Sequence, residues 1–150
     1  MRNTIRASVW SFLFCVSAAV FAGPDSATDL YIENAEIRLP LPGQTTAVVY
    51  LALVNDSLQD RIVSRVTVEA AAASELHQHL HRDGMMRMRR LDRIAVPAGK
   101  TLTFESGSYH IMAFRLDVDD KAMTADATYA VTLIMANGQE ISAQASPIVL

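Results

Sequence analysis

The segment TTAVVYLALVN at residues 45–55 decides the fold. Its residues are apolar almost without a break, and valine, tyrosine and leucine dominate it. A strand of this kind is covered on both faces, because an exposed face would alternate with polar residues. The segment is therefore predicted to be a central strand of a β-rich domain.

Short apolar segments and turns lie on both sides of this strand. Asn137-Gly138 favours a tight hairpin turn, and residues 70–73 start a short helix or merely connect two strands. The pattern predicts about eight strands, no long helix and no internal repeat, in two packed antiparallel sheets, with a closed barrel as the alternative. The other candidate strands are residues 30–39, 62–69, 94–96, 101–105, 110–116, 129–135 and 140–149.

The first residues predict export. Arg2 and Arg6 precede an apolar run at residues 7–22, and small residues stand just before Gly23, as in a cleaved secretory signal. The run is shorter than the roughly 20 apolar residues of a membrane-spanning helix, which makes a retained anchor the weaker alternative. We expect a signal peptide at residues 1–22 and one soluble periplasmic domain at residues 23–150, with no stable membrane insertion.

Cysteine and charge exclude several functions. The only cysteine, Cys15, lies inside the expected signal, after bulky residues that disfavour a lipoprotein signal. The domain therefore has no thiol for a redox pair, a blue-copper centre or a nucleophile. Loss of Arg2 and Arg6 leaves 11 basic residues against 16 acidic ones, a net charge of −5 that argues against a nucleic-acid partner.

Arginines nevertheless crowd into residues 82–93. One explanation is a solvated edge strand that charge keeps from aggregating. The other is a docking patch, formed by Arg87, Arg89 and Arg90, for an acidic partner or an anionic membrane surface.

Histidine and methionine gather in one part of the chain. All four histidines, and four of the six methionines after the signal, fall within residues 77–112. His77, Met88, His110 and Met112 are separated by ten, twenty-one and one residues. Two imidazoles and two thioethers form a soft, neutral donor set that selects Cu(I) over harder cations, zinc included. One such residue alone is more often packing, so the joint pattern carries the prediction.

The strand period explains how two of these donors meet. His110 and Met112 are two residues apart, so they leave the same face of a strand. Asp83-Gly84 predicts a turn that brings Met88 back toward His77.

Three further residues are candidates for a secondary metal site. His79 and His81 share the face of His77 if the strand stays extended, and Met86 shares the parity of Met88. They are extra or exchange ligands in this interpretation, and plain surface polarity is the alternative.

The segment ELHQHLHRDGMMRMR at residues 75–89, followed by VPAG at 96–99 and YHIM at 109–112, closely resembles the periplasmic copper chaperones of the PCuAC family. The signature of that family is a histidine, ten residues, a methionine, twenty-one residues and His-x-Met. This chain meets that spacing at every step. The resemblance extends more weakly over most of the domain.

The resemblance implies a cupredoxin-like Greek-key β-sandwich that binds Cu(I) through His77, Met88, His110 and Met112 and passes it on without catalysis. In that family the usual acceptor is the dinuclear copper centre of cytochrome c oxidase, in subunit II, sometimes with a Sco-type partner. Two departures stand out. Residues 105–108 replace a Lys-Pro-Gly-Gly turn, and His79 and His81 stand where many members carry methionine, which favours Cu(II) binding at a secondary site.

Two rival functions stay open. A copper buffer or resistance protein needs the same pocket and no recipient. A zinc or copper enzyme is suggested by the His77-x-His79 pair. Catalysis by a metal, however, requires an open coordination position and a placed acid or base. The only carboxylates near His77 and His79 in sequence are Glu75 and Asp83. We therefore expect that the protein is not an enzyme.

Overall fold

The computed structural model describes residues 29–82, 84–117 and 127–148. These ranges contain strands and no helix, and thus no helix that could cross a membrane. The expected signal peptide at residues 1–22 lies outside them. The ten strands are β1 (Leu30–Arg38), β2 (Ala47–Asn55), β3 (Arg61–Val68), β4 (Ala71–Arg82), β5 (Met85–Leu91), β6 (Ile94–Val96), β7 (Lys100–Phe104), β8 (Tyr109–Leu116), β9 (Tyr129–Met135) and β10 (Glu140–Pro147).

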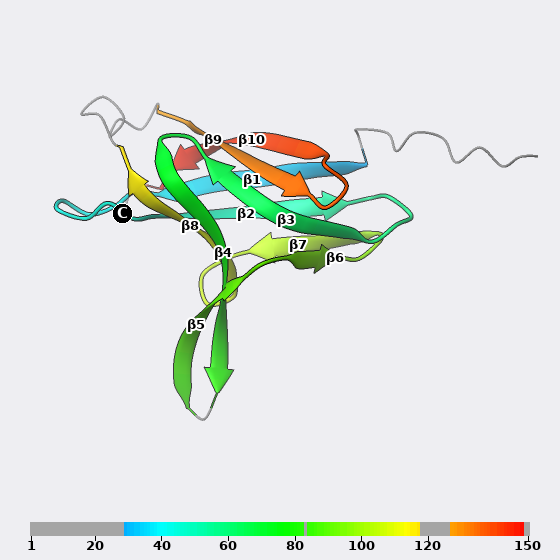
Figure 1. The fold of residues 1–150 in the computed structure, drawn as a ribbon, viewed down its shortest axis with the longest axis horizontal. Coiled ribbons are helices and arrows are strands. Elements are labelled where there is room, and N and C mark those ends of the chain that lie inside the picture. Colours follow the sequence, from blue (N-terminus) through cyan, green and yellow to red (C-terminus); the bar gives the residue numbers. More distant parts are fainter. Residues whose placement is uncertain (1–28, 83, 118–126, 149–150) are drawn as a thin grey trace, which may run out of the picture.

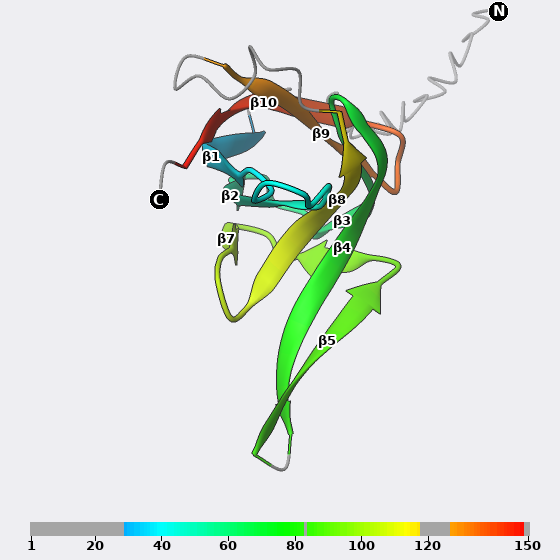
Figure 2. The same cartoon turned by 90° about the vertical axis from the view of Figure 1, so that its left-hand side faces the viewer.

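The strands form one curled sheet in the order β5-β4-β8-β7-β2-β1-β10-β9-β3-β6. Most neighbours are antiparallel, but β7 pairs with β8 in parallel, and β1 and β10 pair in parallel and join the two halves of the sheet. The curl brings the two halves face to face around the core, as Figure 2 shows. The all-β expectation is confirmed, with ten strands in place of about eight.

Strand β2 lies at the centre of the sheet, as predicted, between β1 on one side and β7 and β8 on the other. Val49, Leu51 and Leu53 are buried in the core. The alternate residues Val48, Tyr50 and Ala52 are only partly buried, so the expectation that both faces are covered is wrong for most of the strand. At the end of the strand Val54 and Asn55 are both buried, and Asn55 is bonded to the carbonyl groups of Val96 in β6 and of Pro97.

The two strands beyond the expected eight are β4 and β5, which form a long hairpin. β4 pairs with β8 on one side and with β5 on the other, and β5 has no second partner among the described strands. The sequence leaves residues 70–73 open between a helix and a connection; Ala70 lies in a turn with a φ of 61°, and residues 71–73 are the first residues of β4. The hairpin projects from the body of the sheet in Figures 1 and 2, and every residue of β5 except its last is exposed.

A buried asparagine fixes the end of β2. The Nδ2 group of Asn55 lies 2.9 Å from the carbonyl oxygen of Gln59, 3.0 Å from that of Val96 and 3.1 Å from that of Pro97. Its Oδ1 accepts hydrogen bonds from the backbone N–H and the hydroxyl of Ser57. Because Asn55 is fully buried, these bonds replace all of its contacts with water.

Replacing Asn55 with aspartate removes the only donor on this side chain and turns a carboxylate toward three carbonyl oxygens. We expect Asn55→Asp to lower the free energy of unfolding by about 3 kcal/mol or more. Chemical denaturation measures the change. Asn137→Asp is the control, because Asn137 is exposed and its Oδ1 only accepts a bond from Gln139, so a change within about 0.5 kcal/mol is expected. Equal losses in both variants would contradict this role of Asn55.

Candidate metal centre

The pairing of β4 with its two neighbours gathers the predicted donors on one face. His77 lies directly opposite His110 of β8, and Glu75 lies opposite Met112. On the other side, His79 lies opposite Met88 of β5. Directly paired residues of antiparallel strands point to the same side of the sheet. All four predicted ligands therefore share one face of the three strands β5, β4 and β8.

The imidazole rings lie close together on this face. The centroid of the His110 ring is 5.8 Å from that of His77 and 4.6 Å from that of His79. Phe114, two residues beyond Met112, lies 6.3 Å from the ring of His77 and forms an apolar wall. His110 is the most deeply buried of these residues, with 2% of its surface exposed.

Hydrogen bonds determine which nitrogen of each ring carries the lone pair. Nε2 of His77 lies 2.9 Å from Oε2 of Glu75, and Nδ1 of His110 lies 3.3 Å from the carbonyl oxygen of Ser108. Both oxygens are acceptors, so both nitrogens carry the proton. The lone pairs are then on Nδ1 of His77 and Nε2 of His110. Both atoms are buried and have no hydrogen-bond partner among the described residues.

This arrangement is typical of histidines that bind metals. A ligating imidazole donates its second N–H to a carboxylate or a backbone carbonyl, which fixes the ring and makes the ligating nitrogen more basic. Glu75 and the Ser108 carbonyl supply those acceptors. Two buried lone pairs without a partner cost folding free energy, and a bound cation would recover it.

The pKa of His110 is lower than the ordinary value of 6.5. The largest cause is burial, which penalises the imidazolium, and the neighbouring His79 and His77 add to it. The hydrogen bond to Ser108 acts in the opposite direction. His110 is therefore neutral near pH 7, the form that binds a metal.

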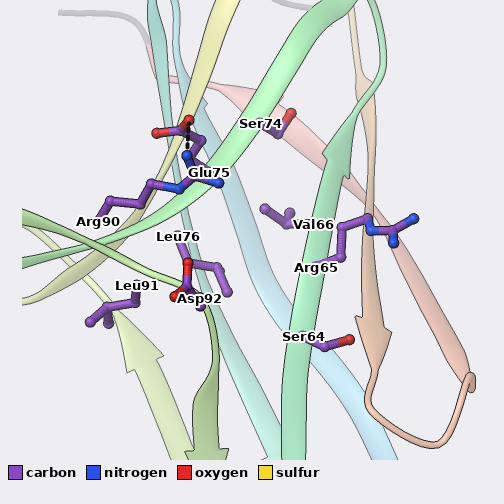
Figure 3. Close-up of a pocket in the computed structure, with 9 residues that line it drawn as sticks. All are labelled: Ser64, Arg65, Val66, Ser74, Glu75, Leu76, Arg90, Leu91 and Asp92. Atoms are coloured by element: carbon purple, nitrogen blue, oxygen red, sulfur yellow. Dashed lines mark ion pairs between the residues drawn. The ribbon is translucent and has the colours of Figure 1, made fainter.

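Glu75 links His77 to an arginine. Its Oε1 lies 3.2 Å from a terminal guanidinium nitrogen of Arg90 while Oε2 holds His77, and Figure 3 shows the ion pair as a dashed line. The two residues line one side of a cavity of about 210 Å³ between β3 and the base of the hairpin. That cavity is polar and adjoins the metal face without containing its donors.

The two thioethers differ in their access to water. Met88 is 50% exposed, on the edge strand of the hairpin. Met112 is only partly exposed, in the middle of β8. The donor face thus has a buried end, at His110 and Met112, and an open end at Met88.

Two of the three candidates for a secondary metal site lie further from His110, toward the tip of the hairpin. His81 and Met86 face each other near the tip of the hairpin, and both are exposed. His79 differs from them, because it belongs to the ring cluster around His110.

The three arginines of the predicted patch do not share a face. Arg87 pairs with Leu80 and Arg89 with Gln78, so both point away from the metal face. Arg90 pairs with His77 on the metal face and is bound to Glu75. Arg87 and Arg89 thus share a face that Arg90 does not, and the docking role of the three arginines stays a prediction.

Sequence reasoning missed two groups of the site. Glu75 stands two residues before His77, and the strand period alone puts it on the same face as His77. The carbonyl of Ser108 gave no signal in the sequence, because it is a backbone group placed by the turn at residues 105–108.

The sequence profile of a family described as "Putative lipoprotein LpqE-like" matches residues 30–147. The chain belongs to the LpqE-like family. No curated protein matches this LpqE-like chain in sequence.

Solved structures confirm the fold that the PCuAC resemblance implied. The copper-bound PCuAC domain of PmoF2 is 20% identical, with a TM-score of 0.64 over 81% of this chain and 94% of that domain. Cu(I)-bound DR1885 from Deinococcus radiodurans is 22% identical, with a TM-score of 0.62 over 79% of this chain and 77% of that chain. The apo PCuAC domain of PmoF1 has a TM-score of 0.65 at 16% identity, over 81% of this chain and 95% of that domain. The LpqE-like chain therefore has the cupredoxin-like fold of PCuAC domains.

The donor set differs from that of a hard-metal site. No three His, Cys, Asp or Glu side chains in the described part of this LpqE-like chain are placed to hold a metal together. The face instead offers imidazole nitrogens in pairs, with thioethers beside them. Such a face suits a soft cation with a low coordination number.

The low pKa of His110 predicts how the stability of the apo protein depends on pH. The unfolded chain binds a proton at His110 near pH 6.5, and the folded chain does so only at lower pH. Stability is therefore lost as the pH falls from about 6.5 through the lower folded pKa.

Urea denaturation at several pH values, with the wild type and His110→Gln, measures this loss. The advantage of the wild type over the variant should shrink as the pH falls from about 7.5 to about 5. His81→Gln, which replaces an exposed histidine outside the ring cluster around His110, is the control. A constant difference between wild type and His110→Gln would show that the folded state does not lower this pKa.

Proposed function

We propose that this chain binds one Cu(I) ion through His77, Met88, His110 and Met112 and carries it to an acceptor protein. One observation carries the proposal. The lone pairs of His77 and His110 are buried without partners on the face that also bears both thioethers. The spacing of the PCuAC signature and the copper held by two of the solved relatives support it.

The donors favour Cu(I) over zinc. Zinc prefers thiolates, imidazoles and carboxylates, usually four of them in a tetrahedron. Here the nearest carboxylate, Glu75, is already bound to His77 and Arg90. Thioethers bind Cu(I) without losing a proton, and a filled d shell accepts three or four neutral ligands.

The same contacts favour a carrier over an enzyme. A metal-dependent hydrolytic enzyme needs a free acid or base beside an open coordination position. Glu75 is occupied by two partners and so does not serve as a general base in this geometry. Met88 lies half exposed on a projecting hairpin, where a ligand of an acceptor can displace it.

The acceptor belongs to the proposal as well. We propose a periplasmic recipient with cysteine or histidine ligands, either the copper centre in cytochrome c oxidase subunit II or a Sco-type protein. The resemblance to the PCuAC family and the export signal expected at residues 1–22 support it. Storage without a recipient, as in a copper buffer or resistance protein, is the alternative, and a transfer experiment separates the two.

Recognition of the acceptor is assigned to the far face of the hairpin. Arg87 and Arg89 are exposed there, free of the copper donors on the other face. Charges at such a position raise association rates with an acidic partner and leave the metal affinity unchanged.

His81 and Met86 are not ligands of the main copper site in this proposal. They offer one imidazole and one thioether in an exposed position. We assign to them only a weak secondary site, for Cu(II) or for excess Cu(I).

Loss of a thioether should weaken Cu(I) binding. Met88→Ala and Met112→Ala should each lower the affinity by about tenfold or more, because even changes outside the first ligands cost 10–100-fold in metal sites. Competition against a chromogenic Cu(I) chelator measures the affinity under reducing conditions.

Met85→Ala is the matched control, because Met85 is 54% exposed on the same strand and points to the opposite face. Its affinity for Cu(I) should equal that of the wild type. Zn(II) affinity above that for Cu(I), indifferent to Met88 and Met112, would refute the proposal.

Delivery should occur by direct contact. When the Cu(I)-loaded chain is mixed with an apo Sco-type or oxidase subunit II domain, the transfer rate should rise with acceptor concentration. Arg87→Gln with Arg89→Gln should slow transfer by roughly threefold or more at low salt and leave Cu(I) affinity unchanged.

The double variant Arg38→Gln with Arg65→Gln is the control, since it removes the same charge from exposed positions on β1 and β3. A rate set only by release of free Cu(I), independent of acceptor, would favour the buffer.

A further inference from the structure

His79 lies closer to His110 than His77 does. The ring centroids of His79 and His110 are 4.6 Å apart, against 5.8 Å for His77 and His110. The Nδ1 atom of His79 is buried and has no hydrogen-bond partner among the described residues. A surface histidine would turn this nitrogen toward water, so the cluster holds a third imidazole whose nitrogen is unpartnered.

The backbone holds His79 in register with the other donors. Its N–H donates a bond of 3.0 Å to the carbonyl oxygen of Ser108, the same atom that accepts the Nδ1–H of His110. One carbonyl group therefore positions both residues. On the other side of β4, His79 lies directly opposite Met88.

The face thus contains two overlapping groups of donors. The inner group is the proposed ligand set of His77, Met88, His110 and Met112, in which Met112 lies on the side of His110 away from the hairpin tip. The outer group is His79, His110 and Met88, nearer the tip of the hairpin. His110 and Met88 belong to both groups.

The Cu(I) ion binds to one donor group or to the other, and not to all the donors at once. The described residues contain no three histidines placed to hold a metal at once, although His110 has a ring neighbour on each side. A Cu(I) ion bound to His110 and Met88 can therefore be completed by His77 and Met112 or by His79. Exchange between them replaces one neutral donor at a time and leaves the ion as Cu(I) throughout.

We propose that His79 is a copper ligand, and that Cu(I) passes between the inner and the outer donor group around the shared His110. The outer group includes the half-exposed Met88 and lacks the partly buried Met112, so it is the state from which the ion leaves. This inference rests on the proposed function, because it describes how the same site releases its ion.

Nuclear magnetic resonance of the full chain tests this without a variant. The imidazole ¹⁵N signals are followed as Cu(I) is added anaerobically to one equivalent. We expect those of His77, His110 and His79 to shift, with Nδ1 of His79 among the shifted atoms. Those of His81, one row further out on the same face, should stay in place.

The outcomes separate the two proposals. Shifts at His77 and His110 with an unchanged His79 would overturn the role of His79 and leave the proposed function intact. If none of the three rings responded, both proposals would fail. Shifts at all three rings support both.

A kinetic measurement gives a second readout. His79→Asn should slow release of Cu(I) to a chelator by about tenfold while the affinity changes by less than about threefold, because the inner group remains. His81→Asn is the matched control and should release copper like the wild type. Release from His79→Asn at the wild-type rate would contradict an exit through the outer group.

Discussion

The register between β4 and β8 is the constraint on which the site depends. Leu76 and Ile111 are direct partners in this pair, and both are buried in the core. Their neighbours His77 and His110 must then point to the other face, directly opposite each other. A slip of one residue would turn the histidines inward and the aliphatic side chains outward, so burial of the core keeps the donors in place.

The curled body of the sheet and the projecting hairpin have different roles. The core of aliphatic residues around β2 supplies stability with no thiol available in the described residues for a disulfide. The hairpin contributes little to that core, because β5 is almost wholly exposed and pairs only with β4. It can therefore keep an exposed thioether and two outward arginines that a packed strand would exclude.

Much of this architecture could be predicted from the sequence. Apolar runs located β2, β3, β9 and β10 to within a few residues, because the alternation of buried and exposed side chains is a local property. The same period put His110 and Met112 on one face of β8. The turn at Gly84 predicted the return of the chain, and the structure gives this glycine a positive φ of 72°.

Features that depend on pairing between distant strands could not be predicted. Nothing local indicates that His77 lies opposite His110, since thirty-two residues separate them. The role of Glu75 depends on that pairing too, because it needs both His77 and Arg90 beside it. Strand parity, in contrast, is a local property, and it puts Arg90 on the opposite face from Arg87 and Arg89.

We propose that two imidazoles and thioether sulfur from this face hold one cuprous ion. X-ray absorption at the copper edge of the Cu(I)-loaded chain tests it most directly, because nitrogen and sulfur scatter differently in the first shell. We predict both nitrogen and sulfur neighbours, with fewer sulfur neighbours when either Met88 or Met112 is replaced by alanine. A first shell of nitrogen and oxygen alone, unchanged by these replacements, would contradict the account.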